Sequence, residues 1–310
     1  MIIVTGTKRS GTSMWMQILD AAGLPEIGTA FPKAWGETLR EANPRGFYES
    51  PLRRGIFYAT NPHPVTGAYL PPEAVRQVAV KVFIPGLCRT DQAFISRVVG
   101  TVRHWREYAA SIERLRRMED EAAEEHNDHD FGPRPRLDAV LEWWLENYAL
   151  IRNLVTRRYP AHLVTYDRIV DAPGEELPEI LEWLGADEIE AGVDAVSPET
   201  RTQRRERIDR SHAYEGIFDE LYELVHAGEE LTGEFVEKLN ETHEALIPEI
   251  EEDRRRVMQG RRERRREMME ANRQESDERA EAPAEEERDD DQERRKYPNP
   301  LNPDALENLV

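Results

Sequence analysis

Residues 2–15 read IIVTGTKRSGTSMW, an apolar run that passes into a tight loop and then into helix-forming residues. The loop combines two glycines, several hydroxyl side chains and two cations, an order typical of a β-strand that leads into a phosphate-binding loop. Gly6 and Gly11 stand at the spacing of a nucleotide-binding P-loop, but Thr12 occupies the position where an NTPase needs lysine. The loop therefore predicts an anion site that differs from that of an ATPase.

The cations lie inside the loop itself, as Lys8 and Arg9. Backbone N–H groups up to Ser13, at the positive end of a helix, suit a phosphate, and the hydroxyls of Ser10 and Thr12 add donors. No predicted strand ends in an evident metal-binding aspartate, so nothing here requires magnesium. A phosphate-like donor held by side-chain cations fits this loop better than ATP with Mg²⁺.

Apolar runs predict four strands, which alternate with helical sequence. The strands are expected at residues 2–5, Val78–Phe83, Val98–Val102 and Ala161–Tyr166, and the main helices at Thr12–Gly23, Trp105 to about Glu125, Leu137–Arg158 and Pro173–Leu184. This alternation predicts an α/β fold with a P-loop-like parallel sheet flanked by helices on both faces.

The character of the chain changes after about Tyr214, where a weak amphipathic pattern gives way to an almost wholly charged segment. We expect an α/β domain over residues 1–213, a charged helical extension over 214–296 and a docking tail over 297–310. The segment 251–296 is interpreted as a solvent-bridging helix, an assembly arm that could make a homo-oligomer, or disorder.

The composition limits the possible partners and the location. Asp and Glu outnumber Lys and Arg by 62 to 42, and the net charge of −20 argues against a general attraction to nucleic acid or to an anionic membrane. Cys88 is the only cysteine, which excludes a disulfide framework. Met1 runs almost directly into the first strand and no stretch approaches the ~20 apolar residues of a membrane span, so we expect a cytoplasmic protein.

A second motif lies at residues 98–111, which read VVGTVRHWREYAAS. A predicted strand ends at Arg103 and a helix follows, with Ser111 eight residues on, a little over two turns into that helix. An arginine at the carboxyl end of a strand and a serine on the next helix could bind one phosphate together.

The two motifs together resemble the sulfotransferases that use 3′-phosphoadenylyl sulfate. The first motif of that family, Lys- or Arg-Ser-Gly-Thr, is matched by residues 9–12, and the second, Arg-seven residues-Ser, by Arg103 and Ser111. Residues 164–173, VTYDRIVDAP, are similar to the family's Tyr-Glu-Asp-Leu stretch, and residues 43–49, NPRGFYE, to an Asn-Pro-Lys-Gly-Tyr-x-Glu segment of bacterial members. The matches follow the family order and cover residues 1 to about 210.

This resemblance implies a donor site without a metal. The 5′-phosphosulfate would be held by Arg9, Ser10, Gly11, Thr12 and Ser13, and the 3′-phosphate by Arg103 and Ser111. Tyr166 falls where the family places an aromatic ring near adenine, and Arg204 or Arg205 would add a late cation to the 3′-phosphate. The product left in the site would be adenosine 3′,5′-bisphosphate.

Sulfuryl transfer is an in-line displacement in which negative charge grows on the leaving oxygen and the acceptor loses a proton. Arg9, with Lys8, is expected to stabilise the leaving oxygen. Glu49 is the first candidate for the general base and His63 the second. Lys81, on the second predicted strand, could point into the site, but a strand lysine that reaches out to solvent is the simpler interpretation.

Two other functions stay open. A P-loop kinase that acts on a small molecule would share the strand-loop-helix start, and an inactive sulfotransferase-like protein could serve assembly through its charged arm. The acceptor is also open, since residues 25–72 and 114–137 carry no motif that distinguishes a small molecule, a carbohydrate or a peptide. A histidine- and aspartate-rich stretch at 126–130 is interpreted as a hydrophilic loop rather than a metal site.

Overall fold

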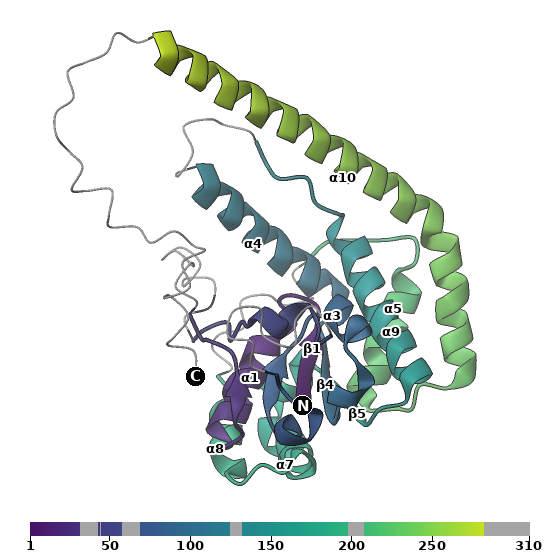
Figure 1. The fold of residues 1–310 in the computed structure, drawn as a ribbon. Coiled ribbons are helices and arrows are strands. Elements are labelled where there is room, and N and C mark those ends of the chain that lie inside the picture. The colour runs from purple at the N-terminus through teal and green to yellow at the C-terminus, as the bar shows by residue number, and fades with distance from the viewer. Residues whose placement is uncertain (32–42, 44, 58–68, 125–131, 198–207, 282–310) are drawn as a thin grey trace, which may run out of the picture.

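The computed structural model describes residues 1–31, 43, 45–57, 69–124, 132–197 and 208–281. The described part is an α/β structure built on a parallel sheet with strand order β2-β3-β1-β4-β5 (Figure 1). The strands are β1 (Ile2–Gly6), β2 (Glu26–Ile27), β3 (Ala79–Lys81), β4 (Arg97–Val102) and β5 (Ala161–Thr165). The predicted fold class is confirmed, with β1 in the centre of the sheet.

Helices cover both faces of this sheet, because alternate residues of β1 point to opposite sides. Ile2 and Val4 pack in one hydrophobic cluster with α1 (Thr12–Ala21) and α7 (Pro173–Leu184). Ile3 packs in another with α3 (Ile84–Arg89) and α5 (Ala139–Arg157). Burial on both faces explains why the first strand reads as an uninterrupted apolar run.

Several boundaries differ from the sequence-based expectation. β2 was not predicted, since two residues that pair only with β3 leave no periodic pattern. A short 3₁₀ turn, η1 (Pro51–Arg54), precedes Gly55. Tyr166 begins a helix, α6 (Tyr166–Asp171), instead of ending a strand, because the Thr165 hydroxyl accepts a hydrogen bond from Arg168 N and caps it.

The remaining elements complete the order of the chain. They are the 3₁₀ turns η2 (Pro72–Val75) and η3 (Gln92–Phe94) and the helices α4 (Trp105–Glu124), α8 (Ile189–Asp194), α9 (Glu215–Ala227) and α10 (Gly233–Glu281). Among the described residues, every helix is too short or too polar to cross a membrane.

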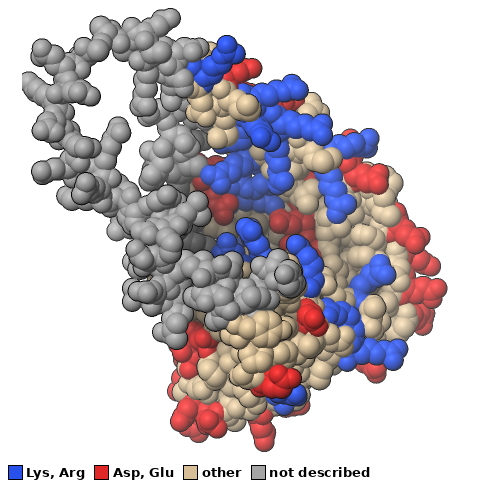
Figure 2. Space-filling view, in the orientation of Figure 1, with Lys and Arg blue, Asp and Glu red and all other residues tan. Residues whose placement is uncertain are grey.

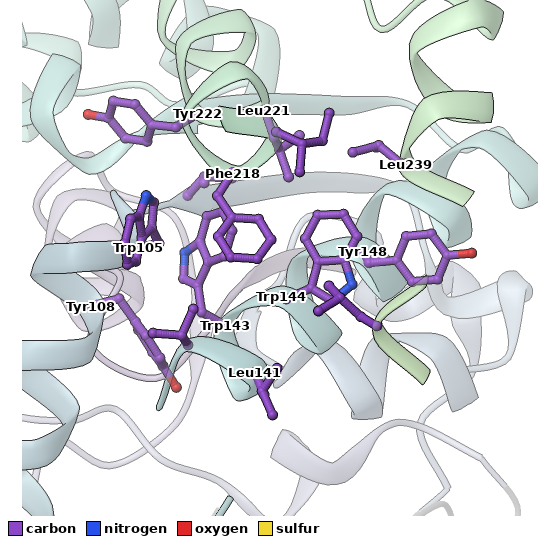
Figure 3. Close-up of a cluster of buried hydrophobic side chains, with 14 of the residues drawn as sticks. Trp105, Tyr108, Leu141, Trp143, Trp144, Tyr148, Phe218, Leu221, Tyr222 and Leu239 are labelled. Carbon is purple, nitrogen blue, oxygen red and sulfur yellow. The ribbon is translucent and has the colours of Figure 1, made fainter. Parts of the chain in front are cut away.

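A third hydrophobic cluster joins α4 and α5 to α9 and the first part of α10 (Figure 3). The ring of Phe218 lies 5.9 Å from that of Trp105, 5.6 Å from that of Trp143 and 5.1 Å from that of Trp144, measured between centroids. The aromatic residues Trp143, Trp144 and Tyr148 of α5 are therefore part of the core. The domain boundary at residue 213 stays a prediction, but side chains from both sides of it share this cluster.

The long helix α10 contains Pro248, whose missing N–H removes a backbone hydrogen bond, and Figure 1 shows the helix bending before it runs past α4. Its first half is anchored in the core by Phe235, Leu239, Leu246 and Ile250. Residues 251–281 are helical, which supports the first two interpretations of the charged segment over disorder for that part. The predicted tail at 297–310 lies outside the described residues.

Candidate active site

The candidate site lies where β1, β3 and β4 end, at the carboxyl edge of the parallel sheet, which is the usual place for a ligand in an open α/β fold. The loop between β1 and α1 turns sharply here. Arg9 has φ 65° and Gly11 has φ 100°, so both adopt the left-handed conformation, and the Ser10 hydroxyl donates to Thr7 O at 2.7 Å. A left-handed arginine is uncommon, and such strain concentrates at functional sites.

Both glycines of the loop motif are required by close contacts. A Cβ on Gly6 would lie 2.4 Å from Ser10 Oγ and 2.6 Å from Thr101 O. A Cβ on Gly11 would lie 2.7 Å from Cδ2 of Tyr166, in a backbone conformation that already disfavours other residues. The loop is therefore pressed against β4 on one side and against the Tyr166 ring on the other.

The two sequence motifs meet at Arg9. Its Nε donates to Ser111 Oγ at 3.3 Å, and Nη1 of Arg103 donates to the backbone oxygen of Arg9 at 2.9 Å. Burial, together with the positive charge of Arg103, lowers the pKa of Arg9 to about 10. Two close, poorly solvated guanidinium groups favour an anion between them.

Arg103 is held in place by two further contacts. Its Nε donates to the fully buried carboxylate of Glu107 at 3.3 Å, and its guanidinium lies over the Tyr166 ring at 4.8 Å from the centroid. Tyr166 therefore forms a wall of the site through both Arg103 and Gly11. Its predicted contact with adenine stays a prediction.

Lys81, at the end of β3, is a site residue that the sequence analysis did not choose. The interpretation as a lysine reaching out to solvent is wrong, because Lys81 is 2% exposed and points toward the loop. Its Nζ lies 2.8 Å from Glu49 Oε1 and 3.3 Å from Ser13 Oγ, and it also donates to Phe47 O. Burial lowers the pKa of Lys81, and the nearby Glu49 carboxylate opposes that shift.

Glu49 is held by cations on both of its oxygens, since Oε2 lies 3.4 Å from Nη1 of Arg53. Because cations contact both of its carboxylate oxygens, the predicted catalytic role of Glu49 requires Lys81 to move away from it. Lys8 is exposed on the rim of the site. His63, Arg204 and Arg205 lie outside the described residues, as does the stretch 126–130.

These side chains surround one cavity of about 600 Å³, a volume typical of a small-molecule site. Its lining includes most of the residues that the sequence suggested, namely Lys8, Arg9, Gly11, Thr12, Ser13, Glu49, Arg103, Ser111 and Tyr166, together with Lys81, Arg53 and Arg114. Ser10, which is part of the loop, is fully buried. Within the described part of the chain, no group of three or more His, Cys, Asp and Glu side chains is placed to hold a metal ion.

No protein-family model and no curated protein matches the chain. Among solved structures the chain is similar to the sulfotransferase domain of the olefin synthase from Synechococcus PCC 7002. The two are 16% identical with a TM-score of 0.35, over 78% of this chain and 94% of that one. A similarity this low carries no argument about activity, so the function has to be argued from the site.

Proposed function

We propose that this protein transfers a sulfuryl group from 3′-phosphoadenylyl sulfate to a hydroxyl or amine acceptor. The observation that supports this most directly is the meeting of Arg9 with Ser111 and Arg103, residues about 100 positions apart, at the start of α1. The donor carries two anionic groups, one at each end of its ribose, and the site offers cations and hydroxyls from two separate motifs.

The proposal assigns the phosphosulfate group to the loop. Its backbone N–H groups, the hydroxyls of Thr12 and Ser13, and Arg9 would bind the anionic oxygens, while Arg103 and Ser111 would bind the 3′-phosphate. Arg9 would stabilise charge on the leaving oxygen during transfer. These interactions are strong because the cations are shielded from water, and opposite charges attract each other more strongly in the protein interior than in water.

The proton of the acceptor has to be taken by a base, and Lys81 controls whether Glu49 is available for this role. Its ammonium group lies beside Ser13 and is paired with Glu49, so an incoming sulfuryl oxygen would compete with the carboxylate for it. Once Lys81 turns to the transferring group, Glu49 is left with Arg53 alone and has a carboxylate oxygen available to accept the proton. His63 is retained as the second candidate base.

Calorimetric titration with adenosine 3′,5′-bisphosphate, with and without EDTA, tests the donor site. We expect saturable binding that EDTA leaves unchanged. Replacing Arg103 with alanine should weaken it by about 10- to 100-fold, since charge-assisted hydrogen bonds contribute ~1.5–3 kcal/mol. Arg117→Ala, which changes an exposed arginine on α4, the helix that follows Arg103, and does not affect the lining of the cavity, is the control and should bind as wild type does.

The same titration separates the alternatives. Absence of binding both with and without EDTA would contradict the sulfotransferase proposal. Nucleotide binding that EDTA abolishes favours a P-loop kinase. Transfer itself is measured with a labelled donor against a panel of acceptors. If Arg9→Ala retains the rate of the wild-type protein, the catalytic assignment is wrong.

A further inference from the structure

A second cavity, of about 880 Å³, lies between α4, residues 133–136 and α10. Its lining contains five arginines, Arg116, Arg134, Arg136, Arg255 and Arg256, and two carboxylates, Glu252 and Glu263. We name it the arginine cavity. In the view of Figure 2, Lys and Arg side chains gather in the upper part of the molecule, over α4 and α10. This local positive charge contrasts with the net charge of the protein, which is −20.

The framework of the arginine cavity is fixed by contacts between α10 and the segment before α5. A Cβ on Gly260 would lie 2.8 Å from Cγ of Pro135, so the two segments pass very close to one another. Asp138 N donates to Asp253 Oδ2 at 2.7 Å, and Arg256 donates to Arg136 O at 2.9 Å. The arginines of the two segments are therefore held facing one space.

Three of the five arginines already have carboxylate partners. Arg136 contacts Asp120 and Glu119 at 2.7 and 3.0 Å, Arg116 pairs with Glu142, and Arg256 pairs with Asp253. Arg134 and Arg255 differ from these. Both are exposed, and neither guanidinium forms an ion pair with any described residue; the Nε of Arg255 donates only to Glu251 O, at 3.3 Å.

We propose that the arginine cavity binds a ligand that carries at least two oxyanion groups. Guanidinium groups bind phosphate, sulfate or carboxylate through two parallel hydrogen bonds, and Arg134 and Arg255 have donors free for this. A single monovalent anion would gain little, because Glu252 and Glu263 line the same space and oppose it. Several linked anionic groups fit both the volume and the spread of the arginines.

This inference is independent of the proposed transfer reaction. The two cavities adjoin across α4, since Glu119 lines the candidate active site while its partner Arg136 lines the arginine cavity. They share no lining residue. A ligand can therefore be assigned to one cavity or the other by substitution.

Titration of the full chain with tripolyphosphate, and separately with citrate, tests the inference at low salt, about 50 mM NaCl, where charge interactions are least screened. We expect saturable binding, and the two arms distinguish a site for linked phosphates from one for carboxylates. The double variant Arg134→Gln/Arg255→Gln should bind at least about 10-fold more weakly. Both residues are exposed, so the thermal unfolding midpoint should stay close to that of the wild type.

The matched control is Arg254→Gln/Arg265→Gln, which removes two exposed arginines from the same helix but outside the cavity, and it should bind within about twofold of wild type. Arg103→Ala should also retain binding. The inference is overturned if neither anion binds saturably, if both double variants lose affinity equally, or if Arg103→Ala abolishes binding while Arg134→Gln/Arg255→Gln does not. The last result would place the anion in the candidate active site.

Discussion

The two arginine-lined cavities hold their charges in different ways. In the candidate active site the contacts join distant parts of the chain, because Arg103 reaches Arg9 across 94 positions and Arg9 reaches Ser111 across 102. In the arginine cavity Arg256 pairs with Asp253 within one helical turn, and most of the arginines on α10 are exposed. The first site is built at the carboxyl edge of the sheet, whereas the second lies between α4, residues 133–136 and α10 and has more exposed arginines.

The pKa shifts follow the same division. Burial and the neighbouring cation Arg103 lower the pKa of Arg9. Burial alone would also lower the pKa of Arg136, but hydrogen bonds to Asp120 and Glu119 outweigh it and raise the pKa. Two buried guanidinium groups that repel each other favour an anion between them, and this repulsion lowers the stability of the protein without a ligand.

The largest expected effect comes from Lys81→Met, which removes the buried cation and leaves Glu49 with one partner. Breaking a buried ion pair from one side costs about 3–5 kcal/mol of unfolding free energy, measured by urea denaturation. Adding Glu49→Gln should restore part of the loss. Lys238→Met, which breaks the exposed pair with Glu220, is the control and should cost less than about 1 kcal/mol. Equal losses for the two lysines would remove the distinction between buried and exposed pairs.

Gly11→Ala should come next, because it places a methyl group against the Tyr166 ring in a left-handed backbone conformation. We expect a loss of about 1–3 kcal/mol in stability and a weaker affinity for adenosine 3′,5′-bisphosphate. Gly216→Ala, where a Cβ meets nothing within 4 Å, should be neutral or slightly stabilising. A Gly11→Ala protein with unchanged stability would show that the loop is not pressed against Tyr166.

The buried carboxyl group of Glu146 on α5 makes the stability of the protein depend on pH. Burial and then Glu142 raise the pKa of Glu146 from 4.5 to about 8, although Lys8 of the loop opposes them. A raised pKa in the folded state adds stability that is complete below the unfolded value of 4.5 and is lost as the pH rises through about 8. Urea unfolding at about pH 5 and about pH 9 should therefore show a fall in stability.

Glu146→Gln should flatten this profile and, at about pH 9, stabilise the protein by on the order of 1–2 kcal/mol. The exposed Glu237→Gln variant serves as the control and should follow the wild-type profile. A wild-type profile that is flat between these two pH values would contradict the buried, protonated state of Glu146.

Arg256→Ala should have the smallest effect, since it removes an ion pair within one turn of α10 and one hydrogen bond to Arg136 O. Such exposed pairs contribute less than about 1 kcal/mol, and a small change in the thermal unfolding midpoint is expected. A loss of more than about 2 kcal/mol of unfolding free energy would mean that the contacts around the arginine cavity stabilise the fold as much as those of the active site, which would contradict the difference drawn between them.

The sequence predicted the fold class and the cations of the loop because those depend on local patterns. The apolar runs located β1, β3, β4 and β5, and the helix predicted at Pro173–Leu184 has the bounds of α7. The spacing of Arg103 and Ser111 is also local, since both follow β4 within a little over two helical turns. Predicting that both contact Arg9 also requires the order of the strands, which places β4 beside β1.

What the sequence could not predict depends on contacts between distant segments. Hydropathy treats Lys81 as a solvent-seeking residue, and only the position of β3 beside β1 shows that it points at the loop. The weak amphipathic pattern after Tyr214 indicated a helix without indicating its partner, yet Phe218 packs among three tryptophans. The arginine cavity was missed for the same reason, because it needs α10 to lie against residues 133–136.

The aromatic cluster around Phe218 also sets the order in which the protein can fold during its synthesis. Phe218 follows Trp105 by 113 residues and Trp144 by 74, so at translation rates of about 5–20 residues per second it appears roughly 6–23 s after Trp105 and roughly 4–15 s after Trp144. Until then the faces of Trp105, Trp143 and Trp144 that Phe218 covers stay open to water or to other proteins. Exposed aromatic faces favour aggregation of a nascent chain, and α9, which carries Phe218, is the element that covers them.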